Sequence, residues 1–355
     1  MYDLLGDRLR ELPRLESLTI YSDITWNDQC HGLPWSTLHS ILSVPHLREF
    51  KLKYMSICPT LRDGEEPRGD FSGHLTSFHY QLHHPRQPWS YPQEIAALAV
   101  ILKKLCDSLE TLVLMSESAP LSTMATLRWP RLRKMVFYGT PLAEPSVRAC
   151  FGMKRLHCLS LRLNPTRDAM PQPIWPAGHD GAFPWPELEC LTVSYPEPQD
   201  DIYNRLPSSL RSLSLRCWYH QHHQWYLARD DVVEIPMTEL LLTSSALLSI
   251  LRRCSTLHLE HVEIEYAADS EDDALLSYVA TTFPHLVELK IHRYRSTATS
   301  NREPDASVVG HSSPSSASLL CARSHLSSDT YRTIACAALE ASASESVLGL
   351  EYQAG

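Results

Sequence analysis

The sequence predicts an α/β solenoid, in which short parallel strands form a curved sheet and helices pack on its outer side. The first observation is an apolar triplet at offsets 0, 3 and 5, as in Leu15, Leu18 and Ile20. The second is that segments with helical spacing precede these triplets. The third is a proline that recurs just before a triplet, where it ends a helix and begins an extended segment.

The triplet spacing is that of a leucine-rich repeat. Between Leu15 and Leu286 the triplets define ten intervals over 271 residues, or about 27 residues each, within the range of this repeat class. The clearest copies begin at Leu15, Leu47, Leu109, Leu132, Leu156, Leu188, Leu210 and Leu286, and weaker copies begin at Leu75, Met237 and Cys254. We therefore expect a leucine-rich-repeat domain of about ten or eleven units over residues 1–296.

Three segments between triplets have the apolar spacing of a helix that packs on one face. They are Ser36–Leu42, Gln93–Cys106 and Asp273–Thr282. Beyond the repeats, residues 297–328 are rich in serine and lack periodicity, which predicts a disordered linker. Residues 329–355 are expected to be a tail with one candidate short helix.

The strand pattern also predicts which side chains face a partner. Side chains alternate between the two faces of a strand, so offsets 3 and 5 should point into the core and offsets 2, 4 and 6 out of the concave face. The charged residues at these outward offsets are Lys51, Lys53, Lys134, Arg162, Arg216 and Lys290, against Glu49, Glu239, Glu260 and Glu288. Their net charge is +2, whereas the whole chain carries −9. The concave face is therefore expected to be less acidic than the rest.

Composition indicates the cellular compartment and the classes of partner that we expect. A net charge of −9 argues against a general nucleic-acid-binding or anionic-membrane surface. The ten cysteines form no C-x-x-C pair, which favours scattered thiols in a reducing compartment. The N-terminus lacks the pattern of a signal peptide, and no stretch of 18 apolar residues occurs. We expect an intracellular protein, cytoplasmic or nuclear, without nucleic-acid or membrane partners.

The sequence offers little for catalysis or metal binding. His220, His222 and His223, with Cys217 and Asp230 nearby, are the most metal-like group, but the second ligand pair of a structural zinc site is missing. Neither a G-x-S-x-G nucleophile turn nor a glycine-rich phosphate loop occurs. We therefore expect no enzyme activity, no cofactor and no bound metal.

Two segments carry a more specific signature. Leu12-Pro13-Arg14-Leu15-Glu16-Ser17-Leu18-Thr19-Ile20 and Phe283-Pro284-His285-Leu286-Val287-Glu288-Leu289-Lys290-Ile291 share the pattern Pro-x-Leu-x-x-Leu-x-Leu or Ile. This pattern resembles the repeat region of fungal F-box leucine-rich-repeat proteins over about residues 1–296. In that family an N-terminal F-box binds the adaptor of a cullin ubiquitin ligase, and the repeats select the substrate.

The resemblance implies a protein-interaction module like the substrate-recognition repeats of such a receptor. No F-box-like Leu-Pro-x-Glu-Ile/Leu helix opens this chain, so the resemblance extends to substrate or partner binding and leaves docking on the cullin adaptor open. A scaffold or adaptor without a ubiquitin role remains the alternative.

The predicted binding residues are aromatic side chains in three insertions and basic side chains on the concave face. Interaction hot spots are enriched in Trp, Tyr and Arg. The aromatic candidates are Trp175, Trp185, Tyr195, Tyr203, Trp218, Tyr219, Trp225 and Tyr226, and the basic candidates are Arg162, Arg216, Lys51 and Lys53. A partner would then contact the concave face and the adjoining rim of loops. The alternative is that these loops fold back and bury their rings as a small satellite core.

Overall fold

The computed structural model places most of the predicted triplets in parallel β-strands. It describes residues 8–21, 32–57, 69–72, 74–82, 92–141, 146–164, 173–175, 178–217, 241–254, 258–294 and 350–351. They fall into two compact units, unit 1 (residues 1–156 and 324–355) and unit 2 (residues 157–323), and each is described by itself.

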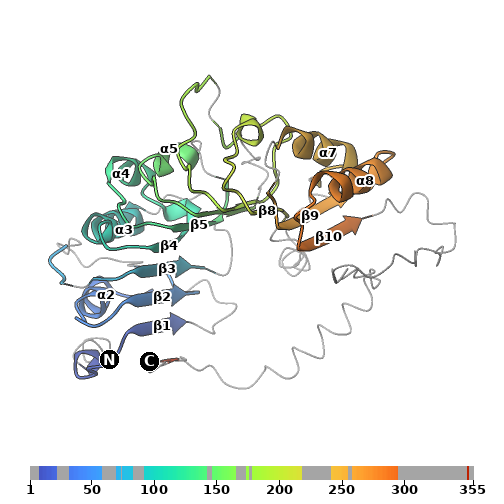
Figure 1. The fold of residues 1–355 in the computed structure, drawn as a ribbon. Coiled ribbons are helices and arrows are strands. Elements are labelled where there is room, and N and C mark those ends of the chain that lie inside the picture. The colour runs from blue at the N-terminus through green and yellow to red at the C-terminus, as the bar shows by residue number, and fades with distance from the viewer. Residues whose placement is uncertain are drawn as a thin grey trace, which may run out of the picture. The chain divides into compact units, whose positions relative to one another are not determined.

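Unit 1 contains a sheet whose five parallel strands follow one another in chain order (Figure 1). Its strands are β1 (Ser17–Tyr21), β2 (Glu49–Lys53), β3 (Ser77–Gln81), β4 (Thr111–Met115) and β5 (Lys134–Gly139). A further two-residue strand, β11 (Leu350–Glu351), pairs antiparallel with β1. The sequence pattern did not predict β11, because two residues carry no periodicity.

The strands of unit 1 are aligned so that apolar side chains stack on one face. The register joins Leu18 to Phe50, Phe50 to Phe78, Phe78 to Leu112 and Leu112 to Met135. All five side chains are buried. In β1, β2 and β3 buried residues alternate strictly with partly exposed ones. The predicted inward offsets are therefore confirmed in this unit.

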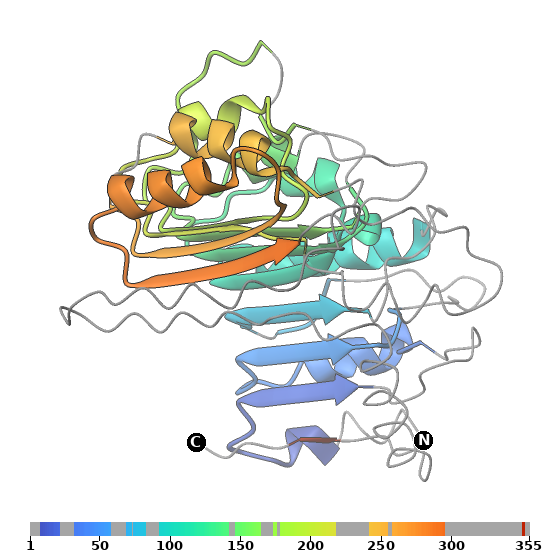
Figure 2. The same cartoon turned by 90° about the vertical axis from the view of Figure 1, so that its right-hand side faces the viewer.

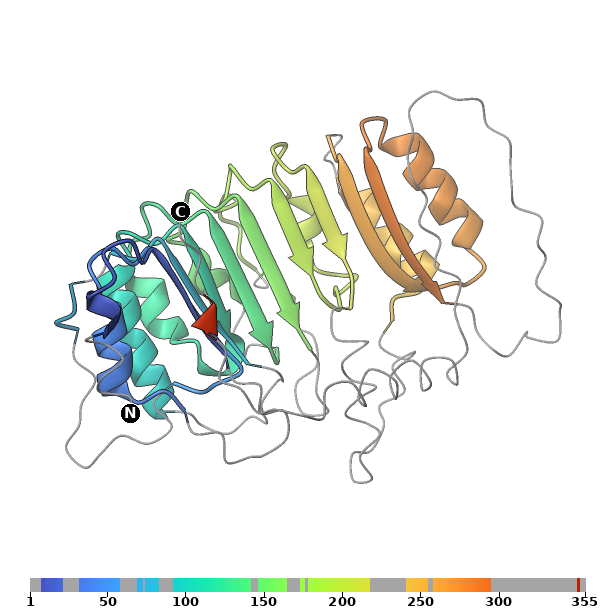
Figure 3. The ribbon, with the colours of Figure 1, turned by 90° about the horizontal axis from the view of Figure 1, so that it is seen from below.

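Helices cover the apolar face of unit 1, as Figure 3 shows. The helical segments are α2 (Trp35–Leu42), η1 (Ser116–Ser118), α3 (Pro92–Leu105), α4 (Leu121–Thr126) and α5 (Ser146–Cys150). The longest, α3, buries Leu98, Ile101 and Leu105 on one face. The predicted helices at 36–42 and 93–106 are confirmed to within one residue at each end.

Unit 2 repeats this arrangement with five parallel strands. They are β6 (Cys158–Leu163), β7 (Cys190–Val193), β8 (Ser212–Leu215), β9 (His261–Ala267) and β10 (Glu288–Tyr294). Helices α7 (Ser244–Arg253) and α8 (Asp272–Thr282) lie over one face of these strands (Figure 2), and η2 (Asp201–Asn204) packs against α7. The third predicted helix, at 273–282, is α8.

The structure corrects the phase of one predicted strand. The triplet at Cys254, Leu257 and Leu259 was expected to form a strand, but Cys254 is the C-cap of α7 and the strand begins at His261. The pairing of Val262 with Leu213 and of Ile264 with Leu215 fixes the true register. Leu259, Val262 and Ile264 thus occupy offsets 0, 3 and 5. The triplet predicted at Met237 lies mostly outside the described residues.

A pair of substitutions in β2 tests the strand phase. Leu52 is fully buried, whereas the neighbouring Lys53 is partly exposed on the opposite face. Leu52→Asp should lower the free energy of unfolding by at least about 3 kcal/mol, because it buries an unpaired carboxylate. Lys53→Asp should change it by no more than about 0.5 kcal/mol. Urea denaturation of both variants measures the difference, and equal losses would contradict the assigned phase.

Candidate partner-binding faces

The outward face of unit 1 presents rows of polar side chains across neighbouring strands. The register aligns Thr19, Lys51, His79, Val113 and Val136 in one row. A second row contains Ser17, Glu49, Ser77, Thr111 and Lys134. Adjacent members of a row lie on strands about 4.8 Å apart, so a single ligand segment can contact several of them. Val113 and Val136 are already buried, and the polar part of the face therefore lies over β1, β2 and β3.

This face of unit 1 contains one hydrogen-bonded carboxylate among several basic groups. The Ser17 hydroxyl donates to Glu49 at 2.7 Å, and Lys51 Nζ lies 2.9 Å from Glu49 Oε1. Burial opposes ionisation of Glu49, but these hydrogen bonds together with the Lys51 charge lower its pKa below the usual value. Lys53 and Lys134 lie on the same face. The outward positions of the parallel strands β1 to β5 carry three lysines against one glutamate, which makes this set of positions positively charged.

His79 lies next to Lys51 in the same row of this face. Its ring Nε2 lies 2.8 Å from the Ser77 hydroxyl and 3.9 Å from Glu49. Burial is the largest effect on this side chain, and the charge of Lys51 is the next; together they lower the pKa of His79 to about 4. The imidazole is therefore neutral near pH 7, and it can accept a hydrogen bond without adding a charge.

The outward face of unit 2 is organised around Glu263. The Ser214 hydroxyl donates to Glu263 Oε2 at 2.7 Å, and Arg216 Nη1 donates to Oε1 at 3.0 Å. His292 Nε2 lies 3.5 Å from the same Oε1. Burial raises the pKa of Glu263, but the interactions with His292, Ser214 and Arg216 outweigh it and hold the pKa at about 2. Arg216, which follows β8, is thus engaged in an ion pair with Glu263 on β9, and His292 on β10 completes a cluster drawn from three neighbouring strands.

The carboxyl ends of β7 to β10 bring a second acidic group next to this cluster. Glu265 accepts a hydrogen bond from the Cys217 backbone N–H and one from the Tyr294 hydroxyl, both at 2.8 Å. Tyr195 packs against Cys217 and Tyr294 in a small buried cluster. Burial is the main reason that the pKa values of Tyr195, Cys217 and Tyr294 are raised. These groups therefore stay neutral, and Glu265 is held by two neutral donors and by Arg216, whose Nε lies 3.9 Å from Glu265 Oε2.

Glu263 and Glu265 were missed at the sequence level because the strand phase was wrong. That interpretation placed Thr256, His258 and Glu260 on the outward face. In the structure Glu260 instead precedes β9 and forms an ion pair with Arg211 at 3.1 Å. The signal that identifies the true strand is the alternative triplet at 259, 262 and 264, combined with a helix that runs to Arg253.

Trp175 and Trp185 are buried, so the prediction that they are exposed anchors for a partner is wrong. Their relative exposures are 3% and 0%. The Trp175 ring stacks on Phe183 at a centroid distance of 6.1 Å, and Phe183 meets Trp185 edge-on at 5.4 Å. The guanidinium of Arg205 lies over the Trp175 ring, with Cζ 4.8 Å from the ring centroid. For these two rings the satellite-core interpretation holds, because Trp175, Phe183 and Trp185 pack against one another.

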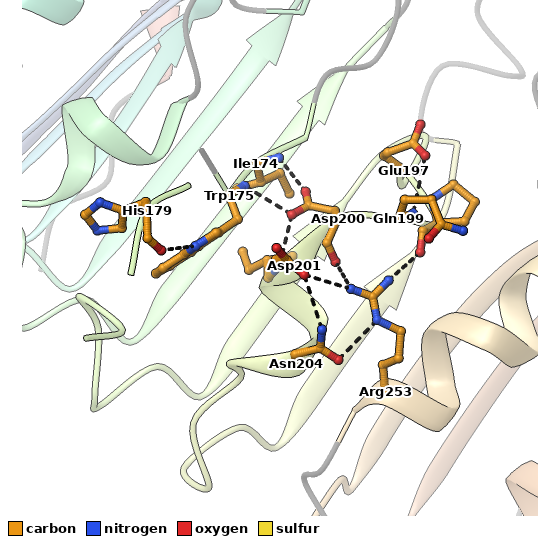
Figure 4. Close-up of polar contacts among 11 residues, drawn as sticks. Ile174, Trp175, His179, Glu197, Gln199, Asp200, Asp201, Asn204 and Arg253 are labelled. Carbon is orange, nitrogen blue, oxygen red and sulfur yellow. Dashed lines mark hydrogen bonds and ion pairs between the residues drawn. The ribbon is translucent and has the colours of Figure 1, made fainter. Parts of the chain in front are cut away.

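The buried carboxylate of Asp200, between β7 and β8, holds the backbone next to Trp175. Asp200 accepts backbone N–H groups from Ile174, from Trp175 at 3.1 Å and from Ile202 at 3.0 Å (Figure 4). Burial raises the pKa of Asp200 despite these three donors. Arg253, at the end of α7, donates to the carbonyl oxygens of Pro198 and Asp200, both at 2.6 Å. The network ties residues 173–175 to η2 and α7.

The remaining predicted residues divide into those on the outward faces and those outside the described residues. Lys51 and Lys53 lie on β2, Arg162 lies on β6 with its Nε 3.1 Å from the Ser160 hydroxyl, and Arg216 follows β8. Tyr203 is buried in η2. Trp218, Tyr219, Trp225 and Tyr226 lie outside the described residues, as do His220, His222 and His223.

The described residues also bear on metal binding and membrane insertion. Within those ranges, no group of three or more His, Cys, Asp or Glu side chains is arranged to hold a metal ion. Among the helices that the structure describes, none has the length and apolar character required to span a bilayer.

Comparisons with known proteins return no match. No model of a known protein family matches the chain, and no curated protein sequence is significantly similar to it. The resemblance to F-box repeat proteins therefore rests on the repeat signature alone.

The Glu263 cluster should make unit 2 sensitive to acid. Because the folded pKa is about 2 and the usual value for glutamate is 4.5, the carboxylate stabilises the fold above about pH 5, and this contribution falls as the pH drops toward 2. Between pH 6 and pH 3 the stability advantage of the native protein over Glu263→Gln should shrink by about 2 kcal/mol. Urea denaturation at both pH values measures it.

Glu288→Gln is the matched control. Glu288 also faces outward, on the adjacent strand, but its side chain is 49% exposed and pairs with Lys290 at 3.0 Å. Its stability difference from the native protein should be nearly the same at both pH values, because exposed pairs contribute little. A Glu263→Gln variant whose difference is equally independent of pH would show that the cluster does not hold the carboxylate ionised.

Proposed function

We propose that the chain is a leucine-rich-repeat protein-interaction module that binds its partner on the outward faces of its strands. The observation that carries this proposal is the strict alternation in β1, β2 and β3, where every second side chain is buried and the others are partly exposed and polar. Helices occupy the opposite face. Such a face offers side chains from many strands to one partner, as extended repeat surfaces do.

The charge on the unit 1 face favours an acidic partner segment. Lys51, Lys53 and Lys134 share this face with His79, whose pKa is lowered mainly by burial and further by the lysine charges. In unit 2 the basic residues Arg216 and Lys290 are each paired with a glutamate. In unit 1 Lys51 is paired with Glu49, and Lys53 and Lys134 add further positive charge on the same face. Complementary charge speeds encounter and selects among partners. The unit 1 face is therefore the proposed primary contact.

In this proposal the module acts like the substrate-recognition repeats of an F-box ubiquitin-ligase receptor, and it performs no catalysis itself. The support is the Pro-x-Leu-x-x-Leu-x-Leu signature at 12–20 and 283–291. We also propose an intracellular setting. Cys106, Cys217 and Cys254 are buried thiols, which fits a reducing compartment.

Capture of partners by the immobilised full chain tests the proposal. Proteins retained from a lysate of the source cells are identified by mass spectrometry, with the native chain and Lys51→Glu/Lys53→Glu compared side by side. We expect the double variant to retain acidic partners about tenfold less, equivalent to 1.4 kcal/mol. Retention of the cullin adaptor in the same experiment distinguishes a ubiquitin-ligase receptor from a scaffold.

The control is Lys103→Glu/Lys104→Glu, which makes the same change in net charge at two exposed positions in the last turn of α3. It should leave capture unchanged, because α3 packs on the other face of the sheet. Equal losses in the two double variants would mean that capture follows net charge, and full capture by Lys51→Glu/Lys53→Glu would place the binding site elsewhere.

A further inference from the structure

Two cysteines occupy matched positions on neighbouring strands of unit 2. Cys158 begins β6 and Cys190 begins β7, and the register pairs them directly. Both carry thiols and both are partly exposed. Each stands one residue before a buried leucine, Leu159 or Leu191, so both side chains point to the outward face.

Backbone hydrogen bonds hold the two positions in register. The N–H groups of Glu189 and Cys190 both donate to the His157 carbonyl oxygen at 2.8 Å. Neighbouring strands lie about 4.8 Å apart, within the roughly 4.4–6.8 Å range of Cα separations found across disulfides. The register therefore places the two Cα positions within the range of separations that a disulfide spans.

We propose that Cys158 and Cys190 form a dithiol site that a low-molecular-weight disulfide, such as oxidised glutathione, converts reversibly into a cross-strand disulfide. The thiolate of one cysteine attacks a glutathione sulfur, forms a mixed disulfide and releases one glutathione thiolate. The thiolate of the other cysteine then attacks the protein sulfur of that mixed disulfide and releases the second glutathione. Two protein thiols are oxidised, one glutathione disulfide is reduced, and both thiol protons pass to the departing thiolates.

The second step is intramolecular, and this favours the bridge over a persistent mixed disulfide. Groups tethered within reach act at an effective concentration on the order of millimolar. At about 0.1 mM reduced glutathione we therefore expect the bridged form to exceed the mixed disulfide by about tenfold. The proposal rests on strand register alone and is independent of the proposed partner.

The test uses the folded full-length chain in a glutathione redox buffer, followed by alkylation, intact mass measurement and peptide mapping. In the native chain the two peptides that contain Cys158 and Cys190 should appear as one cross-linked pair that has lost two hydrogens. Cys158→Ser should instead accumulate a single glutathione adduct on Cys190. Added reductant should restore both thiols.

The register on the other side of β7 suggests a variant in which the disulfide should form again. Ser212 pairs with Cys190 in the same register from the opposite side, on β8. The N–H groups of Arg211 and Ser212 donate to the Glu189 carbonyl oxygen at 2.8 and 2.9 Å, which repeats the arrangement at Cys190. Cys158→Ser/Ser212→Cys should therefore recover the bridge, now between β7 and β8.

A displaced variant supplies the matched negative control. Thr192 also faces outward from β7 and is partly exposed, but it lies two residues beyond the position opposite Cys158. In Cys190→Ser/Thr192→Cys the two Cα atoms are about 8 Å apart, outside disulfide range, and only adducts should form.

Three results would overturn the proposal. They are separate adducts on Cys158 and Cys190 of the native chain, failure of both thiols to react, and bridging in the displaced variant as efficient as in the native chain. Thermal unfolding of each variant, measured before oxidation, ensures that the comparison is made between folded chains.

Discussion

The structure depends on the stacking of apolar side chains from one strand onto the next. In unit 1 the stack runs through Leu18, Phe50, Phe78, Leu112 and Met135, and every member is buried. No strand can bury its own side chains alone, because each is covered by the strands beside it and by the segments packed behind the sheet. The apolar residues therefore determine the strand register. The same register aligns the side chains on the outward face.

That order allows polar chemistry on the other face. Glu263 is brought beside Ser214 and Arg216 because β8 and β9 are held in register by Leu213 with Val262 and Leu215 with Ile264. Burial alone would raise the pKa of Glu263, and the aligned donors lower it to about 2. The same alignment concentrates Lys51, Lys53 and His79 in unit 1 and places Cys158 beside Cys190 in unit 2. One packing rule thus underlies both proposals.

The sequence predicted strands well where one triplet had no competitor. At β9 two apolar triplets lie five residues apart, and only the end of α7 at Arg253 and the pairing with β8 decide between them. The sequence could not determine the fate of Trp175 and Trp185. An aromatic insertion can bind a partner or bury its own rings. Here the rings are buried, and Asp200 accepts hydrogen bonds from the backbone N–H groups of Ile174 and Trp175. The importance of that contact appears only when residues 25 apart are brought together.

The most direct test of the account is side-chain footprinting of the full chain with and without a captured partner. Oxidative labelling followed by mass spectrometry measures the exposure of individual side chains. We predict that the partner protects outward residues of unit 1, such as Tyr21, His79 and Tyr138, and leaves labelling of the outer surfaces of α3 and α4 unchanged. Protection confined to the helices, with the strand faces labelled as in the free chain, would contradict the central claim that the outward strand faces form the binding surface.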